Sequence, residues 1–108
     1  MGFYEAAKKD SIPEGSMKAI KIQEKDILVV NYKGSYYAIG SKCTHMGGDL
    51  SKGVLEGNIV RCPRHGSKFD IITGENISGP KIVFLKLKTP DESTFEVKIE
   101  GDTIMVNI

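Results

Sequence analysis

The last fifteen residues, TFEVKIEGDTIMVNI, contain the feature that most restricts the fold of this chain. Apolar and polar residues alternate on both sides of the dipeptide Gly101-Asp102. A period of two residues is typical of a strand with one buried face, and a Gly-Asp turn between two such runs is typical of a hairpin. The end of the chain is therefore predicted to be a β-hairpin.

The same pattern recurs upstream. Residues 27–32 and 36–39 are predicted to be paired strands, turns are expected at 56–58 and 73–75, and residues 82–87 alternate again. No segment keeps a period of 3.6 residues for more than about two turns. The prediction is an all-β fold, an antiparallel sandwich or barrel of about eight to ten short strands. A chain of 108 residues corresponds to one domain, 1–108, with a polar start before the first strand.

Residues 42–57 interrupt this pattern. The segment contains four glycines and no alternation, and it lies between two predicted strands. Long irregular loops inside compact domains are usually functional. We therefore expect the functional site at this loop and its neighbours.

Charge and hydropathy exclude several classes of function. The net charge of +1 argues against nucleic-acid binding, which usually needs a basic surface. No run approaches the 18 apolar residues of a membrane span, and the first residues lack the apolar core of a signal peptide. We expect a cytoplasmic protein, in which thiols stay reduced and serve as ligands rather than disulfides.

Two short segments, CTH and CPRH, contain every cysteine and histidine of the chain: Cys43, His45, Cys62 and His65. Thiolate and imidazole together suit zinc, copper, or iron–sulfur clusters. A four-ligand zinc site is one alternative, but its usual spacing pairs like residues. Unrelated buried residues would not explain two matched pairs, and a Cys–His hydrolase would leave one pair unused. A [2Fe-2S] cluster with two histidines on one iron uses all four residues.

The sequences CTHMGGDLSKG and CPRHGSKFDIITG resemble the two cluster-binding loops of Rieske proteins. The stretches IPEGSMKAIKI, YYAIGSKCTH and GENISGP extend the resemblance to a soluble Rieske-type ferredoxin. It implies a small cluster-binding subdomain with loops at about 42–57 and 62–69. It also implies one [2Fe-2S] cluster in which Cys43 and Cys62 bind one iron and the two histidines bind the other.

Histidine ligation has an electrostatic consequence. Two Fe³⁺, two sulfides and two thiolates sum to zero charge when both imidazoles are neutral, whereas a four-cysteine cluster carries −2. An electron enters a neutral centre more easily, so such clusters have potentials of roughly −150 to +300 mV, against about −400 mV for plant-type ferredoxins. An imidazole that loses its proton at alkaline pH should lower the potential there.

The neighbours of the ligands are expected to tune this potential. Respiratory Rieske proteins, which this sequence resembles, carry a disulfide between the loops and donate hydrogen bonds to the cluster from a serine and a tyrosine. Gly48 and Arg64 occupy the disulfide positions, Ser67 matches the serine, and Phe69 lacks the tyrosine hydroxyl. We therefore predict a potential below that of the respiratory type. Met46 is expected to shield the cluster, and Pro80 to lie in a third covering loop.

A basic rim around the ligands is the candidate docking surface. Residues 42–68 carry a net charge of +3, and the remainder of the chain carries −2. Such a rim could steer an acidic redox partner. The rim residues are Lys42, Lys52, Arg64 and Lys68.

These features predict a one-electron carrier between a reductase and a terminal oxidoreductase such as an oxygenase, rather than an enzyme. The alternative is a Rieske-like small subunit of a larger enzyme, for example a nitrite reductase or an oxygenase. A zinc-stabilised interaction module is a third class, which an absorption spectrum would separate from the other two because zinc is colourless.

Overall fold

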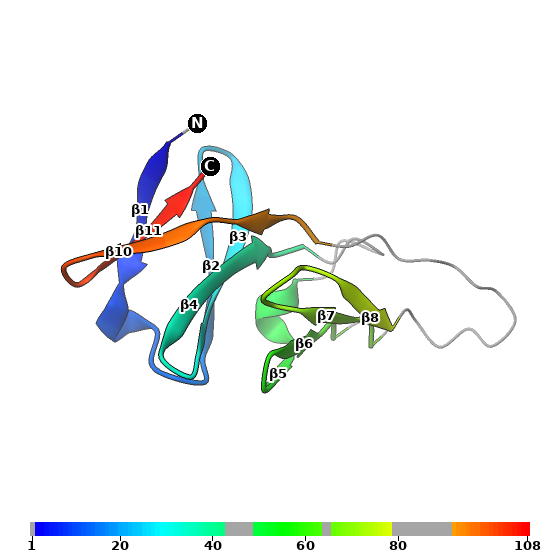
Figure 1. Cartoon of the computed structure of the whole chain (residues 1–108). Coiled ribbons are helices and arrows are strands. Elements are labelled where there is room, and N and C mark those ends of the chain that lie inside the picture. Colours follow the sequence, from blue (N-terminus) through cyan, green and yellow to red (C-terminus); the bar gives the residue numbers. More distant parts are fainter. Residues whose placement is uncertain (1, 43–48, 64–65, 79–91) are drawn as a thin grey trace, which may run out of the picture.

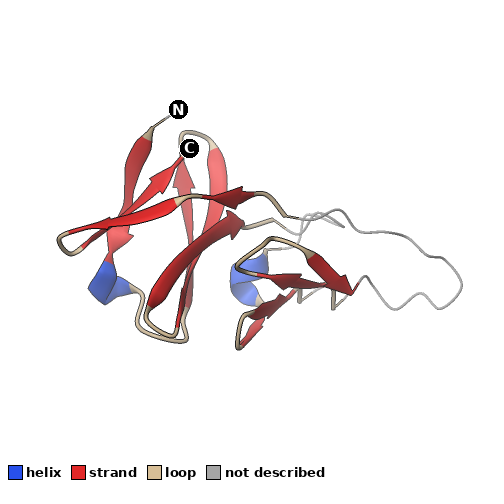
Figure 2. Ribbon diagram, in the orientation of Figure 1, coloured by secondary structure: helices blue, strands red, loops and turns tan. Residues whose placement is uncertain are grey.

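The computed structural model describes residues 2–42, 49–63, 66–78 and 92–108, which form eleven strands in three antiparallel sheets (Figure 1). This confirms the all-β prediction, with one strand more than the expected eight to ten. Two short 3-10 helices, η1 (Lys9–Ser11) and η2 (Leu50–Lys52), are the helical elements of the described part (Figure 2). No helix there is long and apolar enough to cross a membrane.

The first sheet has the order β2-β3-β4-β9, with β2 at Met17–Ile22, β3 at Lys25–Tyr32, β4 at Ser35–Gly40 and β9 at Thr94–Phe95. The hairpin of β3 and β4 confirms the predicted pairing. Its turn residues, Lys33 and Gly34, both have positive φ, 53° and 85°. That combination matches the right-handed twist of paired strands, and glycine at the second position adopts it without strain.

The second sheet has the order β1-β11-β10, and its β10 (Val97–Glu100) and β11 (Thr103–Asn107) form the predicted C-terminal hairpin. Strand β1, Phe3–Lys8, was expected to be a polar start without a strand. The expectation was wrong because the strand pairs with β11 through a register shift between Glu5 and Ala7. Such a bulge removes the alternation by which a strand is recognised in sequence.

Strand β3 is buried on both faces, which explains its continuous apolar run ILVV. Ile27 and Val29 face a core shared with β11, whose Ile104 and Val106 are fully buried. Leu28 and Val30 face a second core, which underlies the third sheet. One strand therefore packs the first two sheets against the third, a small sheet of three-residue strands that carries the candidate site.

The third sheet has the order β5-β6-β7-β8, with β5 at Val54–Glu56, β6 at Ile59–Arg61, β7 at Lys68–Asp70 and β8 at Asn76–Ser78. Residues 42–57 were predicted to be one irregular loop, and this is corrected at both η2 and β5. Strand β5 pairs with β6 across Gly57, whose φ is +61°. Strand β5 was not predicted because three residues are too few to show an alternation of apolar and polar side chains. The strand expected at 82–87 lies outside the described residues.

Candidate metal centre

The thiol of Cys62 lies at the end of β6, at the boundary between the second core and a ligand segment. It is a free cysteine, only 2% exposed, and it packs in the same core as Leu50, Val60 and Phe69. Strand alternation explains this placement: Val60 and Cys62 face the core, whereas Arg61 between them is exposed. The fold thus presents one predicted ligand from a rigid, apolar base.

A closed turn follows Cys62. The Cys62 N–H donates to the Ser67 carbonyl at 2.7 Å, and the Gly66 N–H donates back to the Cys62 carbonyl at 3.1 Å. Gly66 has a φ of +76°, a conformation that other residues rarely adopt. These bonds join Cys62, which follows β6, to Gly66 and Ser67, which precede β7.

The first ligand segment begins and ends on paired residues. Lys42 and Asp49 form an isolated antiparallel bridge, and the Leu50 N–H donates to the Ser41 carbonyl at 2.8 Å. Leu50 is fully buried in the core that contains Cys62. The ends of both ligand segments therefore rest on the same apolar core, as expected for segments whose ligands converge.

Three of the predicted site residues, Cys62, Ser67 and Phe69, are described, and the structure brings them together at one end of β6 and β7. The others lie outside the described residues: Cys43, His45, Met46, Gly48, Arg64, His65 and Pro80. Within the described part, no group of three or more His, Cys, Asp or Glu side chains could hold a metal ion. The proposed ligand set depends on the three residues outside it.

The surroundings of the Ser67 hydroxyl test whether an iron–sulfur cluster fits beside Cys62. The side chain is fully buried, and its Oγ has no hydrogen-bond partner among the described residues. Buried hydroxyls nearly always have a partner, since an unpaired one costs about 1–3 kcal/mol. A buried donor next to a buried thiol fits a cluster, whose sulfurs accept hydrogen bonds.

Phe69 is fully buried in the same core and lies opposite Val60 on the neighbouring strand. Its ring contributes apolar packing below the turn and offers no donor. Respiratory Rieske proteins have a serine and a tyrosine as hydrogen-bond donors to the cluster. Phe69, at the tyrosine position, has no hydroxyl to donate.

Charge at the first segment is organised around Asp49. Its Oδ1 accepts the Ser51 hydroxyl at 2.6 Å and the Ser51 N–H at 3.0 Å, so it caps η2. The hydroxyl bond is the main reason that the pKa of Asp49 lies below its ordinary value, and the charges of Lys42 and Lys52 act in the same direction. Two residues of the predicted basic rim therefore have a carboxylate for a neighbour.

The sequence did not predict that Glu92 is buried or that its segment joins two parts of the fold. This residue is only 7% exposed, its N–H donates to the Gly74 carbonyl at 2.7 Å, and the next residue accepts the Gly40 N–H at 3.0 Å. A Cβ on Gly40 would lie 2.5 Å from Oε1 of Glu92. The segment thus joins the β7–β8 hairpin to the end of β4, close to where the first ligand segment begins. A charged residue in the polar stretch DEST gave no signal of burial.

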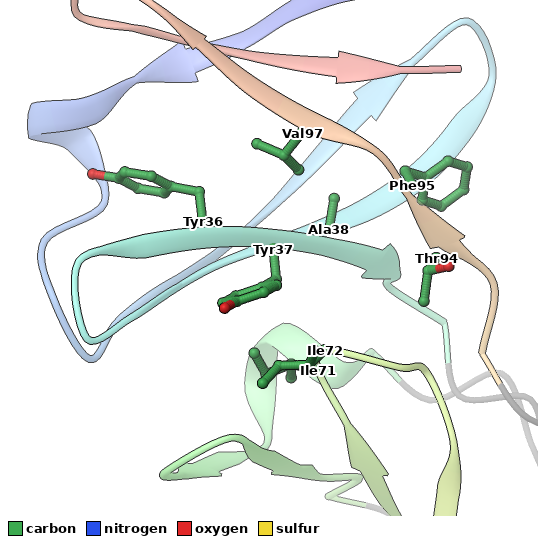
Figure 3. Close-up of a pocket in the computed structure, with 8 residues that line it drawn as sticks. All are labelled: Tyr36, Tyr37, Ala38, Ile71, Ile72, Thr94, Phe95 and Val97. Atoms are coloured by element: carbon green, nitrogen blue, oxygen red, sulfur yellow. The ribbon is translucent and has the colours of Figure 1, made fainter.

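A cleft of about 220 Å³ lies between strand β4 and the β7–β8 hairpin (Figure 3). Tyr37 points toward Ile71 and Ile72 across it, and Thr94 and Phe95 complete one side. Its lining contains no His, Cys, Asp or Glu. The cleft therefore offers none of the side-chain types in the predicted ligand set.

Comparisons with known proteins agree on the family. A family model described as Rieske [2Fe-2S] domain matches residues 2–89. The ferredoxin component of the naphthalene 1,2-dioxygenase/salicylate 5-hydroxylase systems of Ralstonia sp. is 36% identical over 106 residues, covering 98% of this chain and 95% of that protein. The biphenyl 2,3-dioxygenase ferredoxin component of Rhodococcus jostii is 32% identical over 108 residues, covering 100% and 94%. The solved ferredoxin of carbazole 1,9a-dioxygenase from Nocardioides aromaticivorans superposes with a TM-score of 0.83 at 25% identity, covering 98% and 97%.

Proposed function

The chain belongs to the Rieske [2Fe-2S] domain family, and we propose that one [2Fe-2S] cluster is held by Cys43, His45, Cys62 and His65. The cysteines would bind one iron and the histidines the other. The observation that carries the assignment is the burial of the Cys62 thiol beside a Ser67 hydroxyl that lacks a partner in the described part of the chain. Support also comes from the core shared by the bases of both ligand segments.

The chain is an electron-transfer protein of the ferredoxin type and not itself a catalyst. Its relatives are named as ferredoxin components of dioxygenase systems. When bound, the cluster supplies a centre that takes up and releases one electron. We propose that the electron passes from a reductase to a terminal oxygenase, and that the whole chain, 1–108, is one cytoplasmic domain.

The described residues have distinct tasks in this function. The core around Cys62 keeps water from the thiolate side, because its neighbours Leu50, Val60 and Phe69 are all fully buried. The Ser67 hydroxyl could donate a hydrogen bond to a sulfur of the bound cluster, which would stabilise added negative charge and raise the potential. Phe69 adds no second donor, so the potential should lie below that of the respiratory Rieske proteins.

The basic rim of Lys42, Lys52, Arg64 and Lys68 is proposed to meet the redox partner. Charge complementarity around an electron-transfer site raises the rate of encounter more than it raises affinity. Lys42, Lys52 and Lys68 lie on the described elements that flank the two ligand segments, which supports the proposal.

A coulometric titration tests the function. The purified protein, titrated anaerobically with reductant, should take up one electron per chain with bleaching of its visible absorption. Uptake of two electrons, or a colourless protein that contains zinc, would contradict the proposal. Gel filtration of the native protein would separate a free carrier from a fixed subunit of a larger enzyme.

A further inference from the structure

The exposed face of the small sheet carries a row of three side chains next to the Cys62–Ser67 turn. Val54 lies opposite Arg61, and Arg61 lies opposite Lys68. Val60 and Phe69, one position along β6 and β7, are buried, so alternation places the row on the opposite, outer face. We call Val54, Arg61 and Lys68 the Arg61 row.

The two cations of this row lie directly opposite each other, and neither forms an ion pair with a described residue. Like charges directly opposite on paired strands are destabilising. The ion pairs in the described part of the chain, Lys8–Asp102 and Lys98–Glu100, involve neither residue. Lys42 and Lys52 differ in this respect, because the carboxylate of Asp49 lies within their electrostatic reach. Within the described residues, the positive charge of the sheet is thus concentrated at Arg61 and Lys68.

The acidic residues of the same face lie farther from the ligand turn. Glu56, Ile59 and Asp70 form the next outward-facing row, two residues along each strand, or roughly 6–7 Å away. Asp70 already accepts the Ile72 N–H at 2.8 Å. The face is therefore positive beside the turn that carries His65 in sequence and negative at its far end.

Apolar side chains are also exposed on this sheet. Val54 is 46% exposed within the row, and Ile77 in the edge strand β8 is 51% exposed. Protein interfaces combine an apolar contact with complementary charge around it. The Arg61 row presents both on one face.

We propose that the Arg61 row is the docking surface for an acidic face of the redox partner protein, with Val54 as its apolar contact. The proposal rests on the proposed function, and it shifts the centre of the docking surface from Lys42 and Lys52 toward Arg61 and Lys68. The charge gradient along the face would orient the partner so that its acidic side meets the end of the sheet nearest the ligand turn.

Stopped-flow oxidation of the reduced protein tests this surface with two small probes of opposite charge, ferricyanide and hexaamminecobalt(III). The variant is R61Q/K68Q, and the matched control is K18Q/K21Q, which removes the same charge from two exposed positions of β2. At low ionic strength R61Q/K68Q should slow ferricyanide roughly three- to tenfold and accelerate the cobalt complex. The control should change both rates far less, and added salt should abolish the difference.

Equal ferricyanide rates for R61Q/K68Q and K18Q/K21Q would overturn the docking proposal, since the effect would then follow net charge alone. The visible spectrum and the electron count of each variant are recorded first. A wild-type protein without a reducible chromophore would overturn the proposed function, whereas equal rates in intact holoproteins would overturn only the docking surface.

Discussion

The backbone N–H of Cys62 donates a 2.7 Å hydrogen bond to the carbonyl oxygen of Ser67, which joins two residues whose side chains are both buried. This bond closes the turn between β6 and β7 and holds a thiol and a hydroxyl at its base. The Ser67 hydroxyl itself has no hydrogen-bond partner in the described part of the chain. The local backbone thus places a buried hydroxyl donor beside the thiol of a proposed ligand.

Ser67→Ala should lower the midpoint potential of the holoprotein. Loss of one net hydrogen bond of about 0.5–1.5 kcal/mol corresponds to roughly 20–60 mV for a one-electron couple. Protein-film voltammetry measures the shift. Ser11→Ala is the matched control, because its exposed hydroxyl bonds only the Lys8 carbonyl, at 2.7 Å. An unchanged potential in Ser67→Ala would show that the hydroxyl does not face the cluster.

Phe69→Tyr should raise the potential, because the added hydroxyl supplies the second donor of the respiratory proteins. The ring is fully buried, so the new hydroxyl must find an acceptor or destabilise the core. Phe95→Tyr adds the same group in the other core and should leave the potential unchanged. A lower potential in Phe69→Tyr would contradict the assigned role.

Gly53→Ala should destabilise the small sheet by about 2–3 kcal/mol. Gly53 has an ordinary φ of −87°, but an added Cβ would collide with the carbonyl oxygen of Arg61. Gly57→Ala is the control: its φ is +61° and the space around it is open, so it should cost only about 1 kcal/mol. Thermal unfolding of the two holoproteins gives the ranking, and the reverse order would be incompatible with this geometry.

Asp49→Asn should lower the melting temperature at pH 7 by only about 1 to 4 °C, because asparagine can still cap η2 and the variant loses only the negative charge, worth about 0.3–0.5 kcal/mol at a surface site. The pKa of Asp49 is lowered in the folded protein, mainly by the Ser51 hydroxyl. Its stabilisation is therefore complete above the ordinary value near 4 and is lost as the pH falls through the lowered pKa.

The difference between wild type and Asp49→Asn should accordingly shrink as the solution is acidified below about pH 4. Melting curves over this range measure it. A difference that grows toward low pH would mean that the carboxylate destabilises the fold.

The alternation of apolar and polar residues predicted much of the fold where strands are long and each face is clearly buried or clearly exposed. The hairpins around Lys33-Gly34 and Gly101-Asp102 follow directly from turn residues and alternation. Strand β1 was missed because its bulge breaks the alternation, and β5 because three residues carry too little pattern. The ligand segments were predicted from residue type and spacing, and the ligand set stays a prediction because Cys43, His45 and His65 lie outside the described residues. The burial of Glu92 depends on contacts with Gly40 and Gly74, distant in sequence, and could not be predicted.

The central claim is that two histidines bind the cluster. Pulsed EPR of the reduced protein, produced with ¹⁵N-labelled histidine, tests it most directly. A cluster held by Cys43, Cys62, His45 and His65 predicts a paramagnetic signal with hyperfine coupling to two imidazole nitrogens. His65→Ala should remove one coupling or abolish cluster binding, since this chain has no third histidine. A diamagnetic, colourless protein, or a reduced cluster without coupling to histidine nitrogen, would contradict the account.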